Sequence, residues 1–283
     1  MLSNHSISPH DLIGCSFEGY QIEVLVEHND VTGIFVSKQR EEYYIIKAAL
    51  TQNASSLIKH EARMIQDLTH WGVVSLIDQI EIQGLPALVL HRYIRGPLTR
   101  YLGVFSTQEI LTVFTGLCEI CDFIHGKGIC HRDVKPENIV LDQKGRPVLI
   151  DFGMSCLISE QEEHFIGTVE YAAPEVLRGG KVTYESELYC VASVIYTLIH
   201  GVAPSTEASL RTEHGLGMAE DSKLNLMLHP EPSSRSVKTE QVNPKPIPKV
   251  NLNETKKKSS SYFLFTAAIV GIFCLCFALY FSI

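Results

Sequence analysis

Several side chains that can do chemistry lie close together in the stretch "CHRDVKPENIV", residues 130–140. Asp133 is suited to orient a hydroxyl group and accept its proton. The amide oxygen of Asn138 is a ligand type that Mg²⁺ accepts, as is the carboxylate of Asp151 in the nearby "DFG". Apolar segments precede and follow residues 130–140, so the stretch differs from an ordinary solvated run of charges.

These residue types match the needs of phosphoryl transfer. That reaction requires a side chain that orients the attacking hydroxyl, oxygen ligands for Mg²⁺ and a fixed cation on the nucleotide. Asp133, Asn138 and Asp151 suit the first two tasks. Lys47, in the strand-like segment "YIIKAAL", suits the third, with Glu61 in the following segment to hold it in place.

The first third of the chain has the pattern of an antiparallel sheet with one helix. Residues 20–50 alternate between polar and apolar side chains, which predicts strands. Apolar residues recur at three- and four-residue steps over 55–70, which predicts a helix with Ser55 or Ser56 as its N-cap. Residues 73–82 and 85–94 predict two more strands around a turn at Gly84-Leu85-Pro86.

From about residue 106 the pattern becomes helical. Ser106 and Glu109 form a capping-box pattern that opens a predicted helix over 106–128. The almost entirely apolar segment 184–201 predicts a helix at the centre of a helical lobe. A further helical fragment, "SKLNLMLH", follows.

The composition is that of a globular protein and excludes some functions. The net charge of −8 argues against nucleic-acid binding, which needs a clustered basic surface. The N-terminal sequence lacks the basic and apolar regions of a signal peptide, so we expect none there. The eight cysteines are irregularly spaced, so we expect reduced thiols packed as small hydrophobic side chains. A redox or zinc role for the pair Cys118 and Cys121 is the alternative.

Residues 262–283 contain no charged side chain and follow three lysines at 256–258. At about 1.5 Å per residue, a helix of this length reaches the roughly 30 Å of a hydrocarbon core. Lysines beside a span favour the cytoplasmic side. We therefore expect a single-pass tail anchor that leaves the rest of the chain in the cytoplasm; a buried core helix is the alternative.

Taken together, the motifs resemble those of the eukaryotic-like, Hanks-type Ser/Thr protein kinase family. They stand in that family's order: "YIIKAAL" (44–50), "KHEARMI" (59–65), "HRDVKPEN" (131–138), "LIDFGMS" (149–155) and "GTVEYAAPE" (167–175). The resemblance implies an α+β, bilobal protein-kinase fold, with an antiparallel N-lobe sheet plus one helix and a mainly helical, shortened C-lobe. The transmembrane helix would follow it.

Five segments are expected on this basis. They are an N-terminal extension (1–17), the kinase N-lobe (18–95), the shortened C-lobe (96–240), a Pro/Ser/Lys-rich linker (241–261) and the transmembrane helix (262–283).

The resemblance implies a role for each matching residue. Asp133 would be the catalytic base, and Lys135 would meet the transferring phosphate. Lys135 and Thr168 indicate Ser/Thr rather than Tyr substrates. Lys47, paired to Glu61, would hold the α- and β-phosphates of ATP. The residues implied for ATP binding are Lys47, Gly33, Val36, Tyr93, Asn138 and Asp151.

The remaining roles concern the metal and the fold. Asn138 and Asp151 would hold Mg²⁺, or Mn²⁺ in its place. Glu175 would form a structural ion pair with Arg235. The activation segment offers Ser155 and Ser159 as phosphorylation sites, while its acidic residues could pair with Arg132 without phosphorylation.

Three features depart from the family pattern. The glycine-rich loop is replaced by "VEHNDVTGIFV", in which only Gly33 matches. His28 and Asp30 restrict the approach of phosphates, and Asp30 adds a negative charge, so we expect weaker ATP binding. Glu187 stands where the family has an aspartate that bonds the catalytic loop, and its extra methylene is either absorbed or tilts that loop. The C-lobe is also trimmed where substrates often dock.

The expected function is transfer of the γ-phosphoryl group of ATP to Ser/Thr hydroxyls of proteins at the cytoplasmic face of a membrane. The alternative is a membrane-tethered pseudokinase that acts as a nucleotide-binding or scaffolding module. Expected partners are protein substrates, ATP and the membrane, and a homodimer through autophosphorylation. A third reading is a shortened form of a larger receptor kinase.

Overall fold

The computed structural model describes residues 6–161, 165–204 and 213–235. They form two compact units. The first contains residues 6–59 and 76–92, and the second contains 60–75 and the described residues from 93 onward. The expected linker and transmembrane helix lie outside the described residues.

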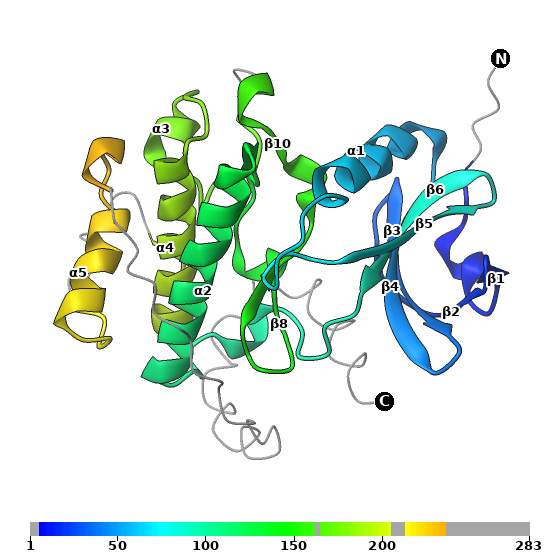
Figure 1. Ribbon diagram of the computed structural model, residues 1–283, viewed down its shortest axis with the longest axis horizontal. Helices are drawn as coiled ribbons and strands as arrows, with labels where there is room; N and C mark the ends of the chain where they lie inside the picture. The colour runs from blue at the N-terminus through cyan, green and yellow to red at the C-terminus, as the bar shows by residue number, and fades with distance from the viewer. Residues whose placement is uncertain (1–5, 162–164, 205–212, 236–283) are drawn as a thin grey trace. The chain divides into compact units, whose positions relative to one another are not determined.

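The first unit is built on a six-stranded antiparallel sheet with the order β1-β2-β3-β4-β6-β5 (Figure 1). Over residues 20–23, Tyr20 and Ile22 are buried while Gln21 and Glu23 are exposed, because successive residues of a strand point to opposite faces. This confirms the strands expected within residues 20–50, 73–82 and 85–94, and the structure adds β1, which we did not expect. The six strands are β1 (Ser16–Phe17), β2 (Tyr20–His28), β3 (Thr32–Gln39), β4 (Glu42–Ala49), β5 (Leu76–Ile82) and β6 (Leu85–His91).

The turn between β5 and β6 lies one residue earlier than we expected. Ile82 pairs with Leu85, so the two turn residues are Gln83 and Gly84, with φ of 51° and 83°. Positive φ at both central positions is the requirement of a type I′ turn, whose twist matches the flanking strands. Leu85 and Pro86 therefore belong to β6 and not to the turn.

Residues 6–17, which we expected to form an extension, are part of the first unit. Leu12, in the 3₁₀ helix Pro9–Leu12, is fully buried. The Ile7 N–H donates to the Leu50 carbonyl at 2.7 Å, and β1 adds a strand to β2. Apolar burial and backbone pairing thus both attach this segment to the sheet.

The helix α1 (Ser55–Ile65) is shorter than the expected 55–70 and has no serine N-cap. It follows directly on a 3₁₀ turn, Gln52–Ala54, and Ser55 already has helical angles. An N-cap residue has extended angles instead, so both Ser55 and Ser56 lie inside the helix. The boundary between the two units falls within α1, between Lys59 and His60.

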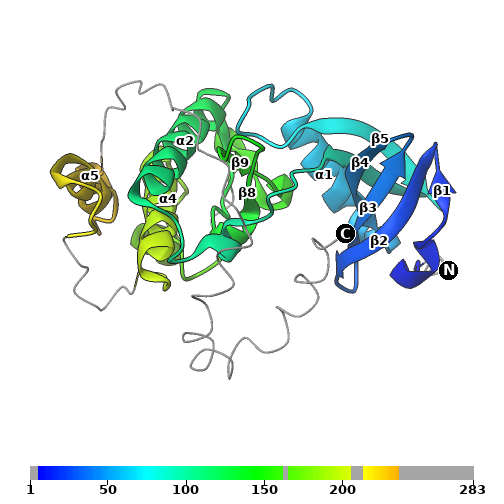
Figure 2. The same cartoon turned by 90° about the horizontal axis from the view of Figure 1, so that it is seen from below.

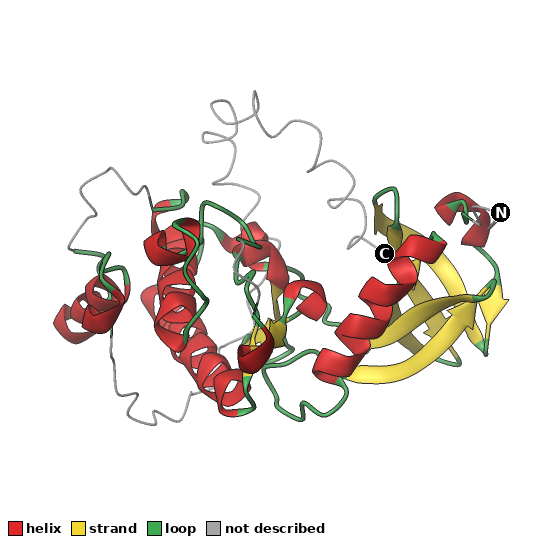
Figure 3. Cartoon of the chain, turned by 90° about the horizontal axis from the view of Figure 1, so that it is seen from above, coloured by secondary structure: helices red, strands yellow, loops and turns green. Residues whose placement is uncertain are grey.

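The second unit is mainly helical (Figure 3). Its long helices α2 and α4 lie side by side (Figure 2). Ser106 and Glu109 form the expected capping box at the start of α2, and α4 is buried along most of its length. The helices are α2 (Thr107–Gly126), α3 (Pro174–Leu177), α4 (Tyr184–His200) and α5 (Met218–Met227).

Two short antiparallel strand pairs complete this unit. β7 (Ile129–Cys130) pairs with β10 (Cys156–Leu157). β8 (Ile139–Leu141) pairs with β9 (Pro147–Leu149). The segment that joins β7 to β8 is the stretch that the sequence marked as catalytic.

The cysteines that the structure describes are free thiols, as expected. Cys118 and Cys121 lie buried in α2, and burial raises the pKa of Cys118 to about 11. Among the described residues, no group of three or more His, Cys, Asp or Glu side chains could hold a metal ion. The redox or zinc reading of the pair is therefore not supported.

No helix among the described residues is long and apolar enough to cross a bilayer.

Candidate active site

The β8–β9 hairpin brings the two expected Mg²⁺ ligands to the same end of a strand pair. Asn138 ends the 3₁₀ turn Pro136–Asn138 directly before β8, and Asp151 follows soon after β9. Ile139 pairs with Leu149, and the Ile150 N–H donates to the Asn138 carbonyl at 2.9 Å. Residues separated along the chain are thus made neighbours by backbone pairing.

Asp133, Lys135 and Thr168 form one compact cluster. The Thr168 hydroxyl donates to Asp133 Oδ1 at 2.6 Å. Lys135 Nζ lies 2.8 Å from Asp133 Oδ2 and donates to Thr168 Oγ1 at 2.9 Å. The carboxylate and the ammonium group therefore hold a threonine hydroxyl between them.

Asn138 fixes the catalytic loop from the other side. Its Nδ2 donates to the backbone carbonyl and to Oδ2 of Asp133, both at 2.9 Å. Both Asp133 atoms are acceptors, so the amide nitrogen of Asn138 must face them. The amide oxygen of Asn138 therefore points away from Asp133. The Asp133 carboxylate is therefore oriented by three neighbours, Asn138, Lys135 and Thr168.

The donor set suits Mg²⁺. Asp151 supplies a carboxylate from a left-handed backbone position, with φ of 61°, and its Oδ1 accepts from the Gly153 N–H at 3.3 Å. Mg²⁺ usually takes one or two carboxylate or amide oxygens from the protein and completes its shell with phosphates and water. Asn138 and Asp151 are the residues that would hold it, and the metal would neutralise charge on the phosphates.

Glu187 holds the backbone at the entrance of the catalytic loop. Its Oε1 accepts the N–H groups of His131 at 2.6 Å and of Arg132 at 2.8 Å. The extra methylene relative to aspartate is absorbed, because the carboxylate reaches both amides from α4. The loop is therefore bonded to α4 with the longer side chain in place.

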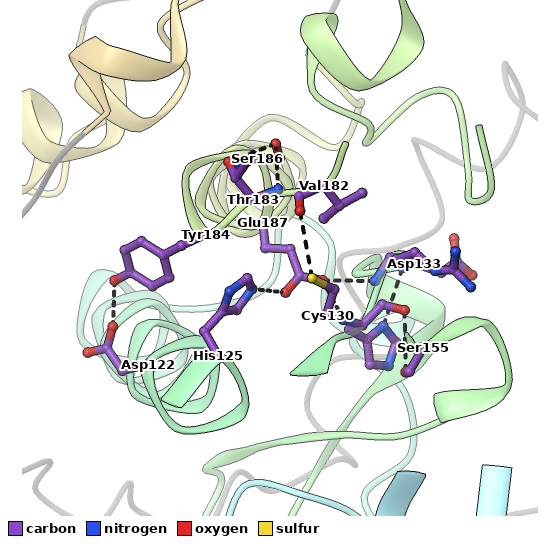
Figure 4. A network of polar contacts seen from close by, with 12 residues as sticks. Asp122, His125, Cys130, Asp133, Ser155, Val182, Thr183, Tyr184, Ser186 and Glu187 are labelled. Carbon is purple, nitrogen blue, oxygen red and sulfur yellow. Dashed lines mark hydrogen bonds and ion pairs between the residues drawn. The ribbon is translucent and has the colours of Figure 1, made fainter. Parts of the chain in front are cut away.

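The second oxygen of Glu187 accepts a hydrogen bond from His125 Nε2, on α2, at 2.5 Å. Figure 4 shows this carboxylate between the His125 ring and the backbone of the loop. The sequence analysis did not identify His125; its only sequence signal was a basic side chain in the last turn of a predicted helix, which normally indicates an interaction with the helix dipole.

His131 is a buried, neutral support of the same loop. The Asp133 N–H donates to His131 Nδ1 at 3.3 Å, so the proton lies on Nε2, which donates to the Ile150 carbonyl at 3.0 Å. Burial lowers the pKa of His131, and its ring packs edge-on against Phe152 at 4.7 Å between centroids. His131 thus connects the catalytic loop to the segment that carries Asp151.

The activation segment contains one expected phosphorylation site that is not accessible. Ser155 is fully buried, with its hydroxyl 3.4 Å from the His131 carbonyl, so it is inaccessible to a kinase in this conformation, whereas Ser159 is exposed. Arg132 directs its Nε at the Met154 carbonyl at 2.5 Å. Three acidic residues, Glu160, Glu162 and Glu163, could pair with Arg132. Glu160 is exposed, Glu162 and Glu163 lie outside the described residues, and the acidic pairing stays a prediction.

Glu175 and Arg235 form a bidentate ion pair. Nη1 and Nη2 of Arg235 lie 2.7 and 2.9 Å from Oε1 and Oε2 of Glu175. The Arg235 side chain is fully buried and also donates to the carbonyls of His229 and Pro230. Burial alone would raise the pKa of Glu175, but the hydrogen bonds from Arg235 and Ser186 hold it below its ordinary value.

The residues implied for nucleotide binding in the first unit all lie on strands. Lys47 is on β4, opposite Ile34 of β3 and Leu88 of β6. Gly33 and Val36 are on β3 and are buried. A Cβ at Gly33 would meet the ring of Phe35 at 2.8 Å, so packing favours glycine there.

The two remaining expected site residues belong to the second unit. Glu61 is on α1 and is almost fully buried. Tyr93 follows β6, is half-buried, and the pKa of its phenol is raised by burial. The Glu61–Lys47 pair joins residues of different units and stays a prediction.

Comparison with known proteins identifies relatives of this chain. The DNA damage-responsive serine/threonine-protein kinase RqkA of Deinococcus radiodurans is 34% identical over 168 residues, which cover 55% of this chain and 25% of that protein. CBL-interacting serine/threonine-protein kinase 15 of Arabidopsis thaliana is 26% identical over 224 residues, covering 76% of this chain and 52% of that protein.

A probable serine/threonine-protein kinase PknB of Corynebacterium glutamicum is 30% identical over 173 residues, which cover 56% of this chain and 27% of that protein. The chain thus spans about half or less of the length of these relatives. The family model for the protein kinase domain matches residues 31–252, which is more than half of the chain. The chain therefore belongs to the protein kinase domain family.

Proposed function

We propose that the protein transfers the γ-phosphoryl group of ATP to Ser/Thr hydroxyls of proteins. The observation that carries the proposal is the position of the Thr168 hydroxyl, 2.6 Å from the Asp133 carboxylate and 2.9 Å from the Lys135 ammonium group. A substrate serine or threonine presents the same chemical group. The cluster already has the donor and the acceptor that such a hydroxyl requires.

The chemistry of each residue follows from its contacts. Asp133 accepts the hydrogen bond of the attacking hydroxyl and takes its proton as the new O–P bond forms, while the bond between the γ-phosphorus and the bridging oxygen breaks and ADP leaves. Lys135 stabilises the negative charge that spreads over the phosphoryl oxygens. Asn138 keeps Asp133 oriented through its two bonds. Lys47 would bind the phosphates of ATP, with Glu61 as its partner.

A pseudokinase is the second candidate, and one observation favours it. The segment at the turn between β2 and β3 carries His28 and Asp30 in place of glycines, and Asn29 Oδ1 accepts hydrogen bonds from two backbone amides of that turn. Occupied amides bind phosphates less readily. A chain that binds nucleotide weakly and acts as a scaffold would tolerate this turn.

A transfer assay separates the two candidates. The purified full-length chain is incubated with Mg²⁺ and γ-labelled ATP, with and without a generic basic protein substrate, beside the variants Asp133→Asn and Lys47→Met. Label on the unaltered chain or on the substrate, and its loss in both variants, is the result we expect. If the unaltered chain transfers no label while it binds ATP, the pseudokinase function holds and the kinase function fails.

We further propose that residues 262–283 anchor the protein to a membrane with the kinase domain in the cytoplasm. Support comes from the absence of charged side chains in this segment and the lysines that precede it. After cell lysis and centrifugation, the full chain should sediment with membranes and a chain that ends at residue 261 should not. Equal recovery of both chains in the supernatant would contradict the anchor.

A further inference from the structure

The turn between β2 and β3 is closed by a single side chain. Asn29 Oδ1 lies 2.9 Å from the Val31 N–H and 2.8 Å from the Thr32 N–H. The Thr32 hydroxyl also lies within reach, at 3.2 Å, and the Asn29 N–H donates to the Thr32 carbonyl at 3.0 Å. Two convergent N–H donors require the oxygen of the carboxamide at this position, so its orientation is determined.

The backbone of this turn does not need glycine. Every residue from 27 to 32, all within the described part of the chain, has a negative φ. His28 pairs with Gly33 at the base of the turn, and the Leu50 N–H donates to the Val31 carbonyl at 2.8 Å. Side chains at positions 28 and 30 are thus compatible with the turn, and its shape is held by Asn29 and by the neighbouring strand.

Successive backbone N–H groups that point at one spot form an anion-binding site. In this turn the amides of Val31 and Thr32 converge on one oxygen atom, and that oxygen belongs to the protein itself. The carboxamide oxygen of Asn29 stands where a phosphate oxygen would accept the same two bonds. The site is therefore occupied from within.

We propose that Asn29 competes with the nucleotide phosphates for the amides of Val31 and Thr32, and that it thereby sets how much these phosphates contribute to binding. The inference rests on the proposed use of ATP. While the Asn29 side chain stays in place, the phosphates form no hydrogen bond with these two amides. The affinity for ATP then comes from the other contacts between the protein and the nucleotide. Asn29 is thus a specificity-determining residue that weakens the discrimination between ATP and adenosine.

Two substitutions at one position test the competition in opposite directions. Asn29→Ala removes the oxygen and exposes the amides. Asn29→Asp keeps an acceptor for the same amides and adds a negative charge that repels phosphates. Asn53→Ala is the matched control, because Asn53 is also an exposed asparagine of the first unit and lies away from the turn in sequence.

Binding of Mg·ATP and of adenosine to the purified full-length chain is measured by calorimetry for all four proteins. We expect Asn29→Ala to bind ATP about tenfold more tightly, since it no longer has to break two hydrogen bonds of ordinary strength. Asn29→Asp should bind ATP more weakly than the unaltered chain. Adenosine affinity should stay within about twofold in every variant, and Asn53→Ala should match the unaltered chain.

The outcomes also separate this inference from the proposed function. Equal or weaker ATP binding by Asn29→Ala, with unfolding midpoints unchanged, would overturn the competition and leave the kinase function standing. ATP binding that appears only in Asn29→Ala would support the competition and contradict kinase activity of the natural chain. If neither the unaltered chain nor Asn29→Ala binds ATP, both proposals fail.

Discussion

His125 on α2 donates a hydrogen bond to the Glu187 carboxylate on α4, and the same carboxylate accepts two backbone N–H groups of the catalytic loop. Both side chains are buried, with exposures of 9% and 1%. One carboxylate therefore connects two helices to the loop that carries Asp133. The position of the loop therefore depends in part on contacts with both helices.

Substitutions of Glu187 should reduce activity through the position of the loop. Glu187→Ala leaves the amides of His131 and Arg132 without their acceptor, and we expect kcat to fall by about 100-fold, because small displacements of catalytic groups have effects of that size. Glu187→Asp shortens the reach by about 1.5 Å and should give an intermediate kcat. KM for ATP should change much less.

The control for this prediction is His125→Gln, which removes the imidazole donor and leaves the carboxylate to hold the loop. It should lower kcat less than Glu187→Ala does. Steady-state kinetics and urea unfolding are measured on all of these proteins. If Glu187→Asp keeps full activity, the longer side chain and its contact with His125 are not needed to position the catalytic loop.

Thr168 should matter through its hydroxyl group. Thr168→Val keeps the shape of the side chain and removes the bonds to Asp133 and Lys135. Hydrogen bonds to charged groups contribute about 1.5–3 kcal/mol, so kcat should fall by about 10- to 100-fold. Thr168→Ser retains the hydroxyl and should remain close to the unaltered chain. Similar kcat values for the valine and serine variants would contradict a role of the hydroxyl.

Gly167 is required where the activation segment passes the catalytic loop. Its φ is 134°, and an added Cβ would lie 2.5 Å from the Arg132 carbonyl oxygen. Gly167→Ala should therefore displace the loop backbone and abolish most activity. Gly179→Ala is the matched control, since Gly179 has a φ of 89° but no atom within 4 Å of the added Cβ.

The control should lose only the cost of a left-handed alanine, about 1–2 kcal/mol of unfolding free energy, with kcat unchanged. Unfolding and kcat measurements on both variants separate the effect of a positive φ from the effect of the steric clash with the Arg132 carbonyl. Equal losses of activity in the two variants would mean that the contact with Arg132 is unimportant.

The ion pair between Glu175 and Arg235 should make stability depend on pH. The pKa of Glu175 is lowered in the folded state, so the folded chain binds fewer protons than the unfolded chain. The stabilisation is fully present above the ordinary carboxyl pKa of about 4.3, and is lost as the pH falls through the lowered pKa. Denaturant unfolding between neutral and acidic pH measures this loss.

Arg235→Met should remove that part of the pH dependence, because the charge that lowers the pKa is gone. At neutral pH it should also cost about 3–5 kcal/mol, the usual cost of breaking a buried pair from one side. Glu175→Gln should likewise flatten the acidic limb. An acidic limb with the same slope in Arg235→Met and in the unaltered chain would contradict the link.

Much of the fold could be predicted from the sequence. The alternation over residues 20–50 predicted β2, β3 and β4, and the capping box at Ser106 predicted the start of α2, because these signals depend on neighbours along the chain. The element ends were less accurate: α1 stops at Ile65, and the turn at Gln83 and Gly84 was placed too late. The position of the turn is set by the pairing of Ile82 with Leu85 across two strands, which the residue pattern along one strand does not specify.

The catalytic motifs likewise placed Asp133, Asn138 and Asp151 by sequence spacing. The sequence interpretation concerned His28 and Asp30 as replaced glycines and assigned no role to Asn29. An asparagine that begins a turn commonly bonds the backbone two residues on, so this signal was available. The sequence did not indicate that the amides of both Val31 and Thr32 would donate to the same oxygen atom of Asn29.

The sequence by itself determined the order of strands and helices, the identities of the catalytic side chains and membership of a family with that order. Only the tertiary structure decided that Glu187 reaches the loop in spite of its length, that His125 shares its carboxylate, and that Ser155 is buried. These contacts join residues as far as 62 positions apart. Such contacts depend on how helices and strands pack against one another, and the periodicity of residues along the chain does not specify that packing.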